Sequence, residues 1–298
     1  MRSSLPGTAA DTCSVKTRLA SLFVLCAVVL APVWPSSAQA SSRMSARRSA
    51  PASVAAPVAC PACWHPGRKV SWQWQLSTPP KASALVDVRM YDVDGFETTK
   101  ILVHKMHTKG IKAVCYLSAG SWEKWRPDAK KFPASVLGKS NGWPGERWLD
   151  IRKRSVLAPI MRARVRMCAR KHFDAIEFDN VDGYQNATGF PLTGAEQLRY
   201  DVFLANAAHR RGMSVLLKND LDQIPKLLGY FDGALNEQCF QYRECGNLRR
   251  FVRAGKPVFN VEYKLAASAF CPKANARNFN SLKKRLSLDA WRVPCRGA

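Results

Sequence analysis

An alternation of strand-like and helix-like segments constrains the fold of this chain more than any other feature. Apolar, strand-like runs occur at residues 71–77, 86–95, 112–120, 175–184, 214–220, 233–239, 256–263 and 290–295. Helical periodicity separates most of them, at residues 98–109, 156–171, 195–211, 223–231, 247–254 and 274–286. Strands that alternate with helices indicate a parallel sheet, and eight such strands predict a single-domain α/β fold, the (β/α)8 TIM barrel.

A doubly wound open sheet is the alternative architecture for such an alternation. That fold would place a glycine-rich phosphate-binding loop after the first strand. The sequence at this point, SWQWQLSTPP (71–80), contains no glycine. The barrel is therefore preferred, and in barrels the chemistry lies where the strands end and run into the following loops.

The first 59 residues precede this pattern. An apolar run from Leu19 to Trp34 follows a basic start, and Ala38-Gln39-Ala40 forms a small-x-small cleavage site. Residues 1–40 therefore predict a secretory signal peptide. A retained anchor is the alternative, but the run is short for a membrane span of about 20 residues. Residues 41–59 are rich in Ser, Ala, Pro and Arg and predict a disordered linker.

The barrel domain then occupies residues 60–298, and cleavage near Ala40 would deliver it to the periplasm or the extracellular space. Eight of the ten cysteines lie beyond the signal segment, and an even number in an exported protein predicts disulfides. About a hundred pairings are possible. The expected pairs are Cys60–Cys63, Cys115–Cys168, Cys239–Cys245 and Cys271–Cys295.

Metal or redox chemistry is the alternative use of these residues. The Cys60-Pro-Ala-Cys63 spacing occurs in zinc and redox sites, but no second CxxC or HxxxH accompanies it. His104 and His107 lie one helical turn apart without an evident third ligand. No metal and no cofactor is expected.

The chain is strongly basic, with 46 Lys and Arg against 22 Asp and Glu and a net charge of +24. Such a charge makes nucleic acid, an anionic membrane or an acidic wall polymer plausible partners. Much of the excess lies in MRARVRMCARK (161–171) and NLRRFVRAGK (247–256), where solvated outer faces of helices are the preferred explanation. A polyanion-binding protein stays open as an alternative, although no specific nucleic acid and no stable membrane insertion is expected.

Acidic, amide and aromatic residues gather where the predicted strands end. In AIEFDNVDGY (175–184), Glu177 and Asp179 share the inner face, because strand side chains alternate. Glycoside hydrolysis requires two carboxyl groups beside the scissile bond. Aromatic rings that could stack on sugars lie near loops or strand ends, although core packing is the alternative for each Trp: Trp72, Trp74, Trp122, Trp125, Trp143, Trp148, Tyr184 and Tyr263. The Trp-, Gly- and Pro-rich segment 121–151 predicts a functional loop.

Several of these stretches, in order, resemble the endo-α-1,4-polygalactosaminidase family, glycoside hydrolase family 114: SWQWQLS, YDVDGF, CYLSAGSWEKWRPD, GWPGERWLDIR, AIEFDNVDGY, LLKND, LNEQCFQYRECG and VFNVEY. The resemblance runs from about Ser71 to Cys295. It implies a TIM-barrel hydrolase that cleaves within α-1,4-linked galactosamine-rich polysaccharide without a cofactor. The family's catalytic Asp matches Asp179 and its catalytic Glu matches Glu237.

By analogy with other α-acting barrel enzymes, Asp179 is expected to be the nucleophile and Glu237 the general acid/base. This retaining mechanism requires carboxyl groups about 5–5.5 Å apart. It also requires a raised pKa for Glu237 and an Asp179 that stays ionised through neighbours such as Asn180 or Lys218. The expected substrate-binding residues are Trp74, Asp92, Ser118, Trp122, Glu177, Asn180, Asp182, Tyr184, Lys218, Asn219, Glu262 and Tyr263, with structural ion pairs as the alternative role of the acids.

The charge of the chain fits this substrate poorly, because deacetylated polygalactosamine is cationic and would be repelled at long range. An acidic mouth could reverse the repulsion within a Debye length of about 8 Å. The substrate could instead be largely N-acetylated, a biofilm exopolysaccharide or another α-linked glycan. A catalytically inactive carbohydrate-binding barrel is a further alternative, and a monomer is expected.

Overall fold

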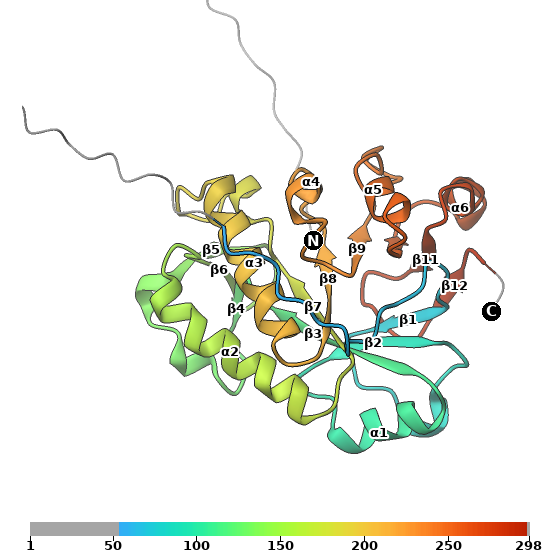
Figure 1. Cartoon of the computed structure of the whole chain (residues 1–298), viewed down its shortest axis with the longest axis horizontal. Helices are drawn as coiled ribbons and strands as arrows, with labels where there is room; N and C mark the ends of the chain where they lie inside the picture. Colours follow the sequence, from blue (N-terminus) through green and yellow to red (C-terminus); the bar gives the residue numbers. More distant parts are fainter. Residues whose placement is uncertain (1–53, 297–298) are drawn as a thin grey trace, which may run out of the picture. The chain divides into compact units, whose positions relative to one another are not determined.

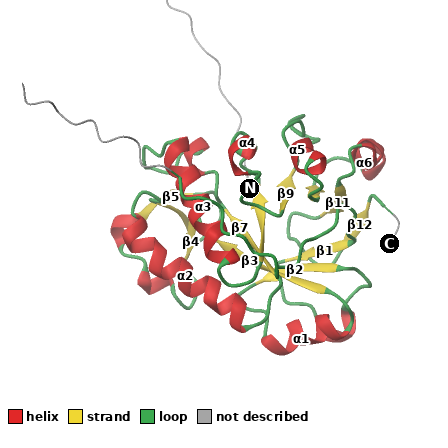
Figure 2. Cartoon of the chain, in the orientation of Figure 1, coloured by secondary structure: helices red, strands yellow, loops and turns green. Residues whose placement is uncertain are grey.

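Eight parallel strands form the centre of the structure, and helices surround them (Figure 1; Figure 2). The structure is a computed structural model that describes residues 54–296. The strands follow one another around the sheet in chain order. They are β1 (Trp72–Gln75), β2 (Met90–Asp94), β3 (Lys112–Ser118), β7 (Ala175–Asp179), β8 (Ser214–Lys218), β9 (Gly233–Glu237), β10 (Val258–Glu262) and β11 (Asn280–Lys284). The predicted TIM barrel is confirmed.

The eighth strand does not lie where the sequence placed it. Residues 280–284 pair in parallel with β10, whereas the predicted strand at 290–295 reduces to β12 (Arg292–Pro294), which pairs antiparallel with β11. The expected helix at 274–286 is likewise wrong, because helix α6 covers Ala267–Ala276. Residues NSLKK lack β-branched side chains and favour a helix by local propensity. Pairing with β10 and burial of Leu282 inside the barrel override that preference.

The sheet is nearly closed between β1 and β11. The backbone carbonyl of Asn280 accepts from the Trp72 indole at 2.9 Å, and its side-chain oxygen accepts from the Val70 amide at 3.2 Å. Beyond the strand ends, the Leu76 amide donates to the Leu288 carbonyl at 3.0 Å. These contacts hold β1 against the last strand.

The outer layer contains α1 (Lys100–Thr108), α2 (Arg154–Arg170), α3 (Gly194–His209), α4 (Ile224–Leu227), α5 (Arg249–Arg253) and α6. Local signals set several helix starts. The Thr99 hydroxyl caps α1, and Thr193 and Glu196 form a reciprocal capping box at α3. Only a 3-10 turn, Ala82–Ala84, connects β1 and β2.

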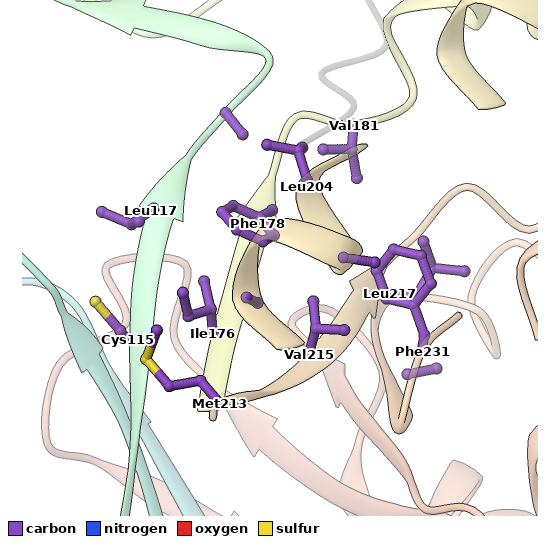
Figure 3. Close-up of a cluster of buried hydrophobic side chains, with 14 of the residues drawn as sticks. Cys115, Leu117, Ile176, Phe178, Val181, Leu204, Met213, Val215, Leu217 and Phe231 are labelled. Carbon is purple, nitrogen blue, oxygen red and sulfur yellow. The ribbon is translucent and has the colours of Figure 1, made fainter. Parts of the chain in front are cut away.

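The outward faces of β3, β7 and β8 form the main hydrophobic core. Ile176, Phe178, Val215 and Leu217 from these strands pack toward Leu204 of α3 (Figure 3). The inward faces enclose a second apolar cluster of Trp72, Trp74, Met90, Val114, Ala175, Leu216, Leu235, Phe259, Val261 and Leu282. The barrel interior is therefore a packed core, and only its carboxyl end is available for chemistry.

The predicted functional loop at 121–151 is a small antiparallel sheet. It contains β4 (Ser121–Glu123), β6 (Glu146–Leu149) and β5 (Leu137–Ser140), in the order β4-β6-β5. A bidentate ion pair from Arg164 of α2 to Asp128, at 2.8 Å and 2.9 Å, ties this segment to the barrel. Gly120 precedes it, and a Cβ there would lie 1.6 Å from the Asn180 carbonyl oxygen. The close approach brings β4 directly against the end of β7.

All four predicted disulfides are present in the structure, which confirms the expected cysteine pairing. The predicted signal peptide and residues 41–53 of the predicted linker lie outside the described residues. Residues 54–59 are ordered against the barrel, since Asn206 of α3 bonds both the Val58 amide and the Ala56 carbonyl. No helix within residues 54–296 is long and apolar enough to cross a membrane.

Candidate active site

Three carboxylates surround one buried ammonium group at the carboxyl end of the barrel. Lys218, at the end of β8, lies 2.9 Å from Glu177, 2.9 Å from Asp179 and 3.4 Å from Glu237. Each of these residues faces inward from its own strand, and the Lys218 Nζ also lies 4.7 Å from the centroid of the Trp74 ring. Burial lowers the pKa of a lysine, but here the three carboxylates outweigh it and raise the pKa of Lys218 well above its usual value.

Asp179 is held as an anion by a set of donors. Its Oδ1 accepts from Lys218, and its Oδ2 accepts from the Tyr116 hydroxyl at 2.7 Å and from the Asn180 amide at 3.2 Å. Burial raises the pKa of the Asp179 carboxyl. Lys218 and the hydrogen bonds lower this pKa by more than burial raises it, so it lies well below the usual range. The side chain is still 12% exposed. Asp179 is thus an ionised carboxylate that solvent can reach.

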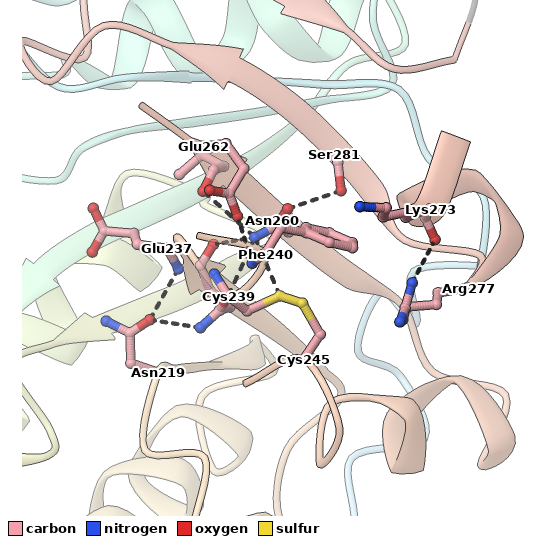
Figure 4. Close-up of a disulfide and its surroundings, with 12 residues drawn as sticks. Asn219, Glu237, Cys239, Phe240, Cys245, Asn260, Glu262, Lys273, Arg277 and Ser281 are labelled. Carbon is pink, nitrogen blue, oxygen red and sulfur yellow. Dashed lines mark hydrogen bonds between the residues drawn. A yellow bond between two sulfur atoms is a disulfide. The ribbon is translucent and has the colours of Figure 1, made fainter. Parts of the chain in front are cut away.

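Glu237 is positioned by its backbone and by an aromatic hydroxyl. Asn219, which has a positive φ of 49°, accepts from the Glu237 backbone amide at 3.0 Å (Figure 4). The Tyr263 hydroxyl donates to Oε1 of Glu237. The Cys239–Cys245 disulfide follows immediately after the strand. Burial raises the pKa of Glu237, but Lys218 and the Tyr263 hydrogen bond lower it below its ordinary value. The pKa of Glu237 is therefore lowered and not raised as expected, because the ammonium group lies close to its carboxyl.

The shared ammonium group limits the distance between the two carboxylates. Oδ1 of Asp179 lies 2.9 Å from Nζ of Lys218 and Oε2 of Glu237 lies 3.4 Å from it, so these oxygens are separated by at most the sum, 6.3 Å. Retaining glycosidases hold their carboxyl groups about 5–5.5 Å apart, and inverting enzymes about 6.5–9.5 Å. The bound on this oxygen pair lies below the range of inverting enzymes.

Asp92 and Glu177 form a second carboxyl pair beneath the first. Both are fully buried, and neither oxygen of Asp92 nor Oε2 of Glu177 has another hydrogen-bond partner. Burial, together with the charge and hydrogen bond of Glu177, raises the pKa of Asp92 well above its usual value. Burial also raises the pKa of Glu177 above its usual value, although the charge of Lys218 lowers it. The raised pKa values favour one proton shared between Asp92 and Glu177.

A cavity of about 340 Å³ opens beside Asp179. The antiparallel segment supplies Glu123, Trp125, Arg126, Trp143 and Glu146, and the barrel strands supply Asp94, Tyr116 and Asp179. Arg126 is neutralised within this wall, since it bonds Glu123 at 2.6 Å and Asp94 at 2.7 Å. The remaining lining charge is negative, and Trp125 presents an indole that is 48% exposed.

The structure brings together part of the predicted site. Asp179, Glu237, Lys218, Asn180, Asn219 and Tyr263 form one hydrogen-bonded group, and Ser118 supports it by accepting from Asn180 at 3.0 Å. Trp74, Asp92 and Glu177 face inward as predicted, but they are fully buried below this group. These three residues do not contact the cavity where a substrate would bind, because the interior of an eight-stranded barrel is filled by side chains.

Four other predicted residues point elsewhere. Glu262 lies on the outer face of β10, where it accepts from the Phe240 amide at 2.8 Å and points away from Glu237 (Figure 4). Trp122 bonds the Ala129 carbonyl and packs against the main core. Tyr184 donates to Asp220, and Asp182 binds Asn186 in the loop after β7. None of these four lines the cavity beside Asp179.

Sequence reasoning missed Tyr116, Glu123, Arg126 and Glu146 as site residues. For Tyr116 a signal existed, since it shares a strand face with Ser118, and Ser118 pairs with Asp179 of the neighbouring strand β7. The other three belong to the segment predicted as a functional loop. Their positions depend on the strand pairing within that segment, which no local pattern specifies.

This chain is similar to known proteins in sequence and in fold. The family model described as glycoside-hydrolase family GH114 matches residues 53–298. The crystal structure of Aspergillus fumigatus Ega3 in complex with galactosamine is similar, with a TM-score of 0.76 and 38% identity over 80% of this chain and 99% of that chain. The glycoside hydrolase domain of PelA from Pseudomonas aeruginosa has the same fold, with a TM-score of 0.62 and 15% identity over 75% and 97%.

One curated relative also matches. An uncharacterized protein of Deinococcus radiodurans is 27% identical over 206 residues, which are 60% of this chain and 64% of that protein. The chain therefore spans less than two thirds of the length of that relative. Within residues 54–296, no three His, Cys, Asp or Glu side chains are grouped so that they could hold a metal ion.

Proposed function

Because this chain belongs to glycoside-hydrolase family GH114, we propose that it is an endo-acting hydrolase of α-1,4-linked, galactosamine-rich polysaccharide. One observation carries the mechanism: Asp179 and Glu237 meet at a single ammonium group, with at least one oxygen pair no more than 6.3 Å apart. That spacing supports attack by one carboxylate on the anomeric carbon while the other protonates the leaving oxygen, with retention of configuration.

The surroundings favour Asp179 as the nucleophile. It is closer to Lys218 than Glu237 is, and it accepts two further hydrogen bonds, from Tyr116 and Asn180. Donors that bind the ionised form stabilise a carboxylate anion. Glu237 has the weaker contact with Lys218, so it is the carboxyl that takes up a proton first when pH falls. It would donate this proton to the leaving oxygen and later accept one from the attacking water.

The lowered pKa of Glu237 predicts an acidic pH optimum. The competent pair has Asp179 ionised and Glu237 protonated, and Asp179 stays ionised to low pH because its pKa is far below the usual range. The competent fraction of the free enzyme therefore rises as pH falls from 7 toward the pKa of Glu237, which lies below the ordinary glutamate value. kcat/KM should rise over the same interval.

The cavity also supports a substrate that carries amino groups. Asp94, Glu97, Glu123 and Glu146 line it together with Asp179, against the single guanidinium of Arg126. Carboxylates that line the cavity attract the ammonium groups of a deacetylated glycan within the Debye length of about 8 Å, although the net charge of the whole chain is +24. Trp125 and Trp143 offer ring faces for sugar stacking. The Ega3 structure contains galactosamine, which is consistent with this class of substrate.

The test is product analysis on galactosamine polysaccharides of graded acetylation. New reducing ends that appear within long chains indicate endo-hydrolysis, and NMR that detects the α-anomer first indicates retention. Asp179→Asn and Glu237→Gln should each lower kcat by about a thousandfold or more. Asp222→Asn is the matched control, because Asp222 is an exposed acid in a loop at the same end of the barrel and is not one of the carboxylates around Lys218.

Two outcomes would contradict parts of the proposal. Saturable glycan binding without new reducing ends would identify an inactive carbohydrate-binding barrel. Initial release of the β-anomer would refute the retaining mechanism while leaving the hydrolase intact.

We also propose secretion after cleavage near Ala40, with support from the four disulfides, which require an oxidising compartment. Amino-terminal sequencing of the exported protein tests this.

A further inference from the structure

A groove between helices α2 and α3 is lined mostly by arginine. Its walls are Arg162, Val165 and Arg166 from α2, and Ala207, Arg210 and Arg211 from α3 and the residues just after it. The groove has a volume of about 350 Å³. The two helices lie side by side in the outer layer (Figure 1). All four arginines are exposed, so their guanidinium groups face solvent across this groove.

The positive charge of the groove is uncompensated. None of the four arginines makes an ion pair with any residue in the described range 54–296. Helix α2 contains five arginines and no acidic residue. Arg162, Arg166 and Arg170 follow one another at intervals of four residues, and like charges at this spacing destabilise a helix. The uniform positive charge is complementary to an anionic ligand, which would relieve this repulsion.

The residue type and spacing indicate a repeating anion. Arginine presents a planar fork of donors that matches carboxylate and phosphate groups in a bidentate manner. The row from Arg162 to Arg170 extends about 12 Å along α2, with one guanidinium group every 6 Å or so. Arg210 and Arg211 face this row from the other wall. A linear chain with an acidic group on each repeating unit would meet several of these donors in succession.

The shape excludes wider or flatter partners. Packed helices lie only about 8–10 Å apart, so the groove between them is too narrow to seat a nucleic-acid duplex. No large exposed hydrophobic residue lies on α2 or α3, so nothing there would insert into a lipid surface. Phe203, the aromatic ring beneath the groove, is buried and covered by Arg154 and Arg162, each 5.4 Å from its centroid. No ring is therefore free to stack on bases, as single-stranded nucleic acid would require.

We propose that this arginine groove binds a linear anionic glycan or polymer with carboxylate or phosphate groups along a single chain. The groove lies outside β3, β7 and β8, and Arg210 and Arg211 come just before β8 begins at Ser214. It is therefore at the opposite end of the barrel from Asp179 and Glu237, which end their strands. A polymer bound there leaves the catalytic mouth open and holds the protein on an anionic matrix.

The experiment compares two triple variants of the full chain that remove equal charge. The groove variant is Arg162→Gln/Arg166→Gln/Arg211→Gln. The control is Arg249→Gln/Arg250→Gln/Arg253→Gln on α5, where three exposed arginines line none of the cavities described for residues 54–296. Binding is measured over a salt series with polygalacturonate as the carboxylate probe and inorganic polyphosphate as the phosphate probe, and their relative affinity identifies the preferred anion.

The groove variant should bind the preferred probe at least about tenfold more weakly, and its log–log salt slope should be smaller by about 2 for three lost contacts. The α5 variant should change affinity less than about threefold. Arg→Lys at the three groove positions should give an intermediate loss, since charge is kept and bidentate geometry is lost. The rate of hydrolysis of a short galactosamine oligosaccharide with uncharged end groups should be the same in all variants.

Equal weakening by the two triple variants would overturn the proposal, because net charge alone would then explain binding. Tighter binding of a DNA duplex or of anionic lipid vesicles than of either linear probe would also overturn it. These outcomes are independent of the hydrolase assignment, since the probes contain no galactosamine.

Discussion

Replacing Lys218 with methionine tests the central electrostatic feature of the site. The substitution removes the cation that lies 2.9 Å from Glu177, 2.9 Å from Asp179 and 3.4 Å from Glu237, and it leaves all three carboxylates buried. Breaking a buried ion pair by removing one partner costs about 3–5 kcal/mol. We therefore expect the free energy of unfolding to fall by about 4 kcal/mol at pH 7.

The loss should shrink as the pH is lowered. In the native protein the pKa of Asp179 lies below its unfolded value, so its stabilisation is present above about pH 4 and is lost only as pH falls through the folded pKa. Without Lys218, the pKa of one of the three carboxyl groups in the folded protein rises above its value in the unfolded chain. The variant then gains stability as this carboxyl group takes up a proton. One proton bound between pH 7 and pH 5 returns about 2.7 kcal/mol. The difference between the proteins should fall to about 1–2 kcal/mol at pH 5.

The assay is urea unfolding followed by tryptophan fluorescence at pH 5, 6 and 7 with the disulfides intact. Lys284→Met is the matched control, because Lys284 is a buried lysine inside the barrel that bonds Gln73 and the Asp289 carbonyl and no carboxylate. Burial lowers the pKa of Lys284 to about 8. Lys284 thus stays charged from pH 5 to 7, and its variant should show a constant difference. A constant difference for Lys218→Met as well would refute the shared-cation argument.

Three further predictions concern single contacts. Tyr116→Phe removes the 2.7 Å hydrogen bond to Asp179, and kcat/KM should fall about tenfold to hundredfold at unchanged thermal stability; an unaltered rate would remove Tyr116 from the mechanism. Asp92→Asn keeps a hydrogen-bond donor to Glu177. The raised pKa of Asp92 costs stability as pH rises above about 4, and the variant avoids this cost. Urea unfolding should therefore show a more stable protein at pH 7 but not at pH 4, and equal gains at both values would contradict the shared proton. Cys115→Ala/Cys168→Ala opens a 53-residue loop and should cost about 4 kcal/mol by calorimetry, with a loss below 1 kcal/mol as the contrary result.

Part of the fold and site was readable from local sequence because the relevant signals are local. Alternation along AIEFDNVDGY put Glu177 and Asp179 on one face, and the structure confirms that both reach Lys218. The spacing of polar residues at strand ends located the mouth. Cysteine pairing was also correct for all four bonds.

Other features depended on partners distant in the chain. The last barrel strand, NSLKK, was predicted as a helix because its local propensity is helical, and only the edge of β10 makes it a strand. Glu262 was assigned to the mouth, but the alternation at the end of β10 turns it outward while Tyr263 reaches Glu237. Glu123 and Glu146 enter the cavity through the pairing of β4 with β6.

The sequence by itself determined the barrel class, the presence of disulfides and the strand faces that carry the acids, since a two-residue period and an even cysteine count need no knowledge of distant neighbours. Only the tertiary structure decided which acids solvent can reach. Asp92, Glu177, Asp179 and Glu237 all occupy inward positions, but their depth depends on the stagger between strands and on the side chains packed below. That stagger makes Asp92 and Glu177 a buried, proton-sharing pair and leaves Asp179 at the cavity, with Lys218 between them.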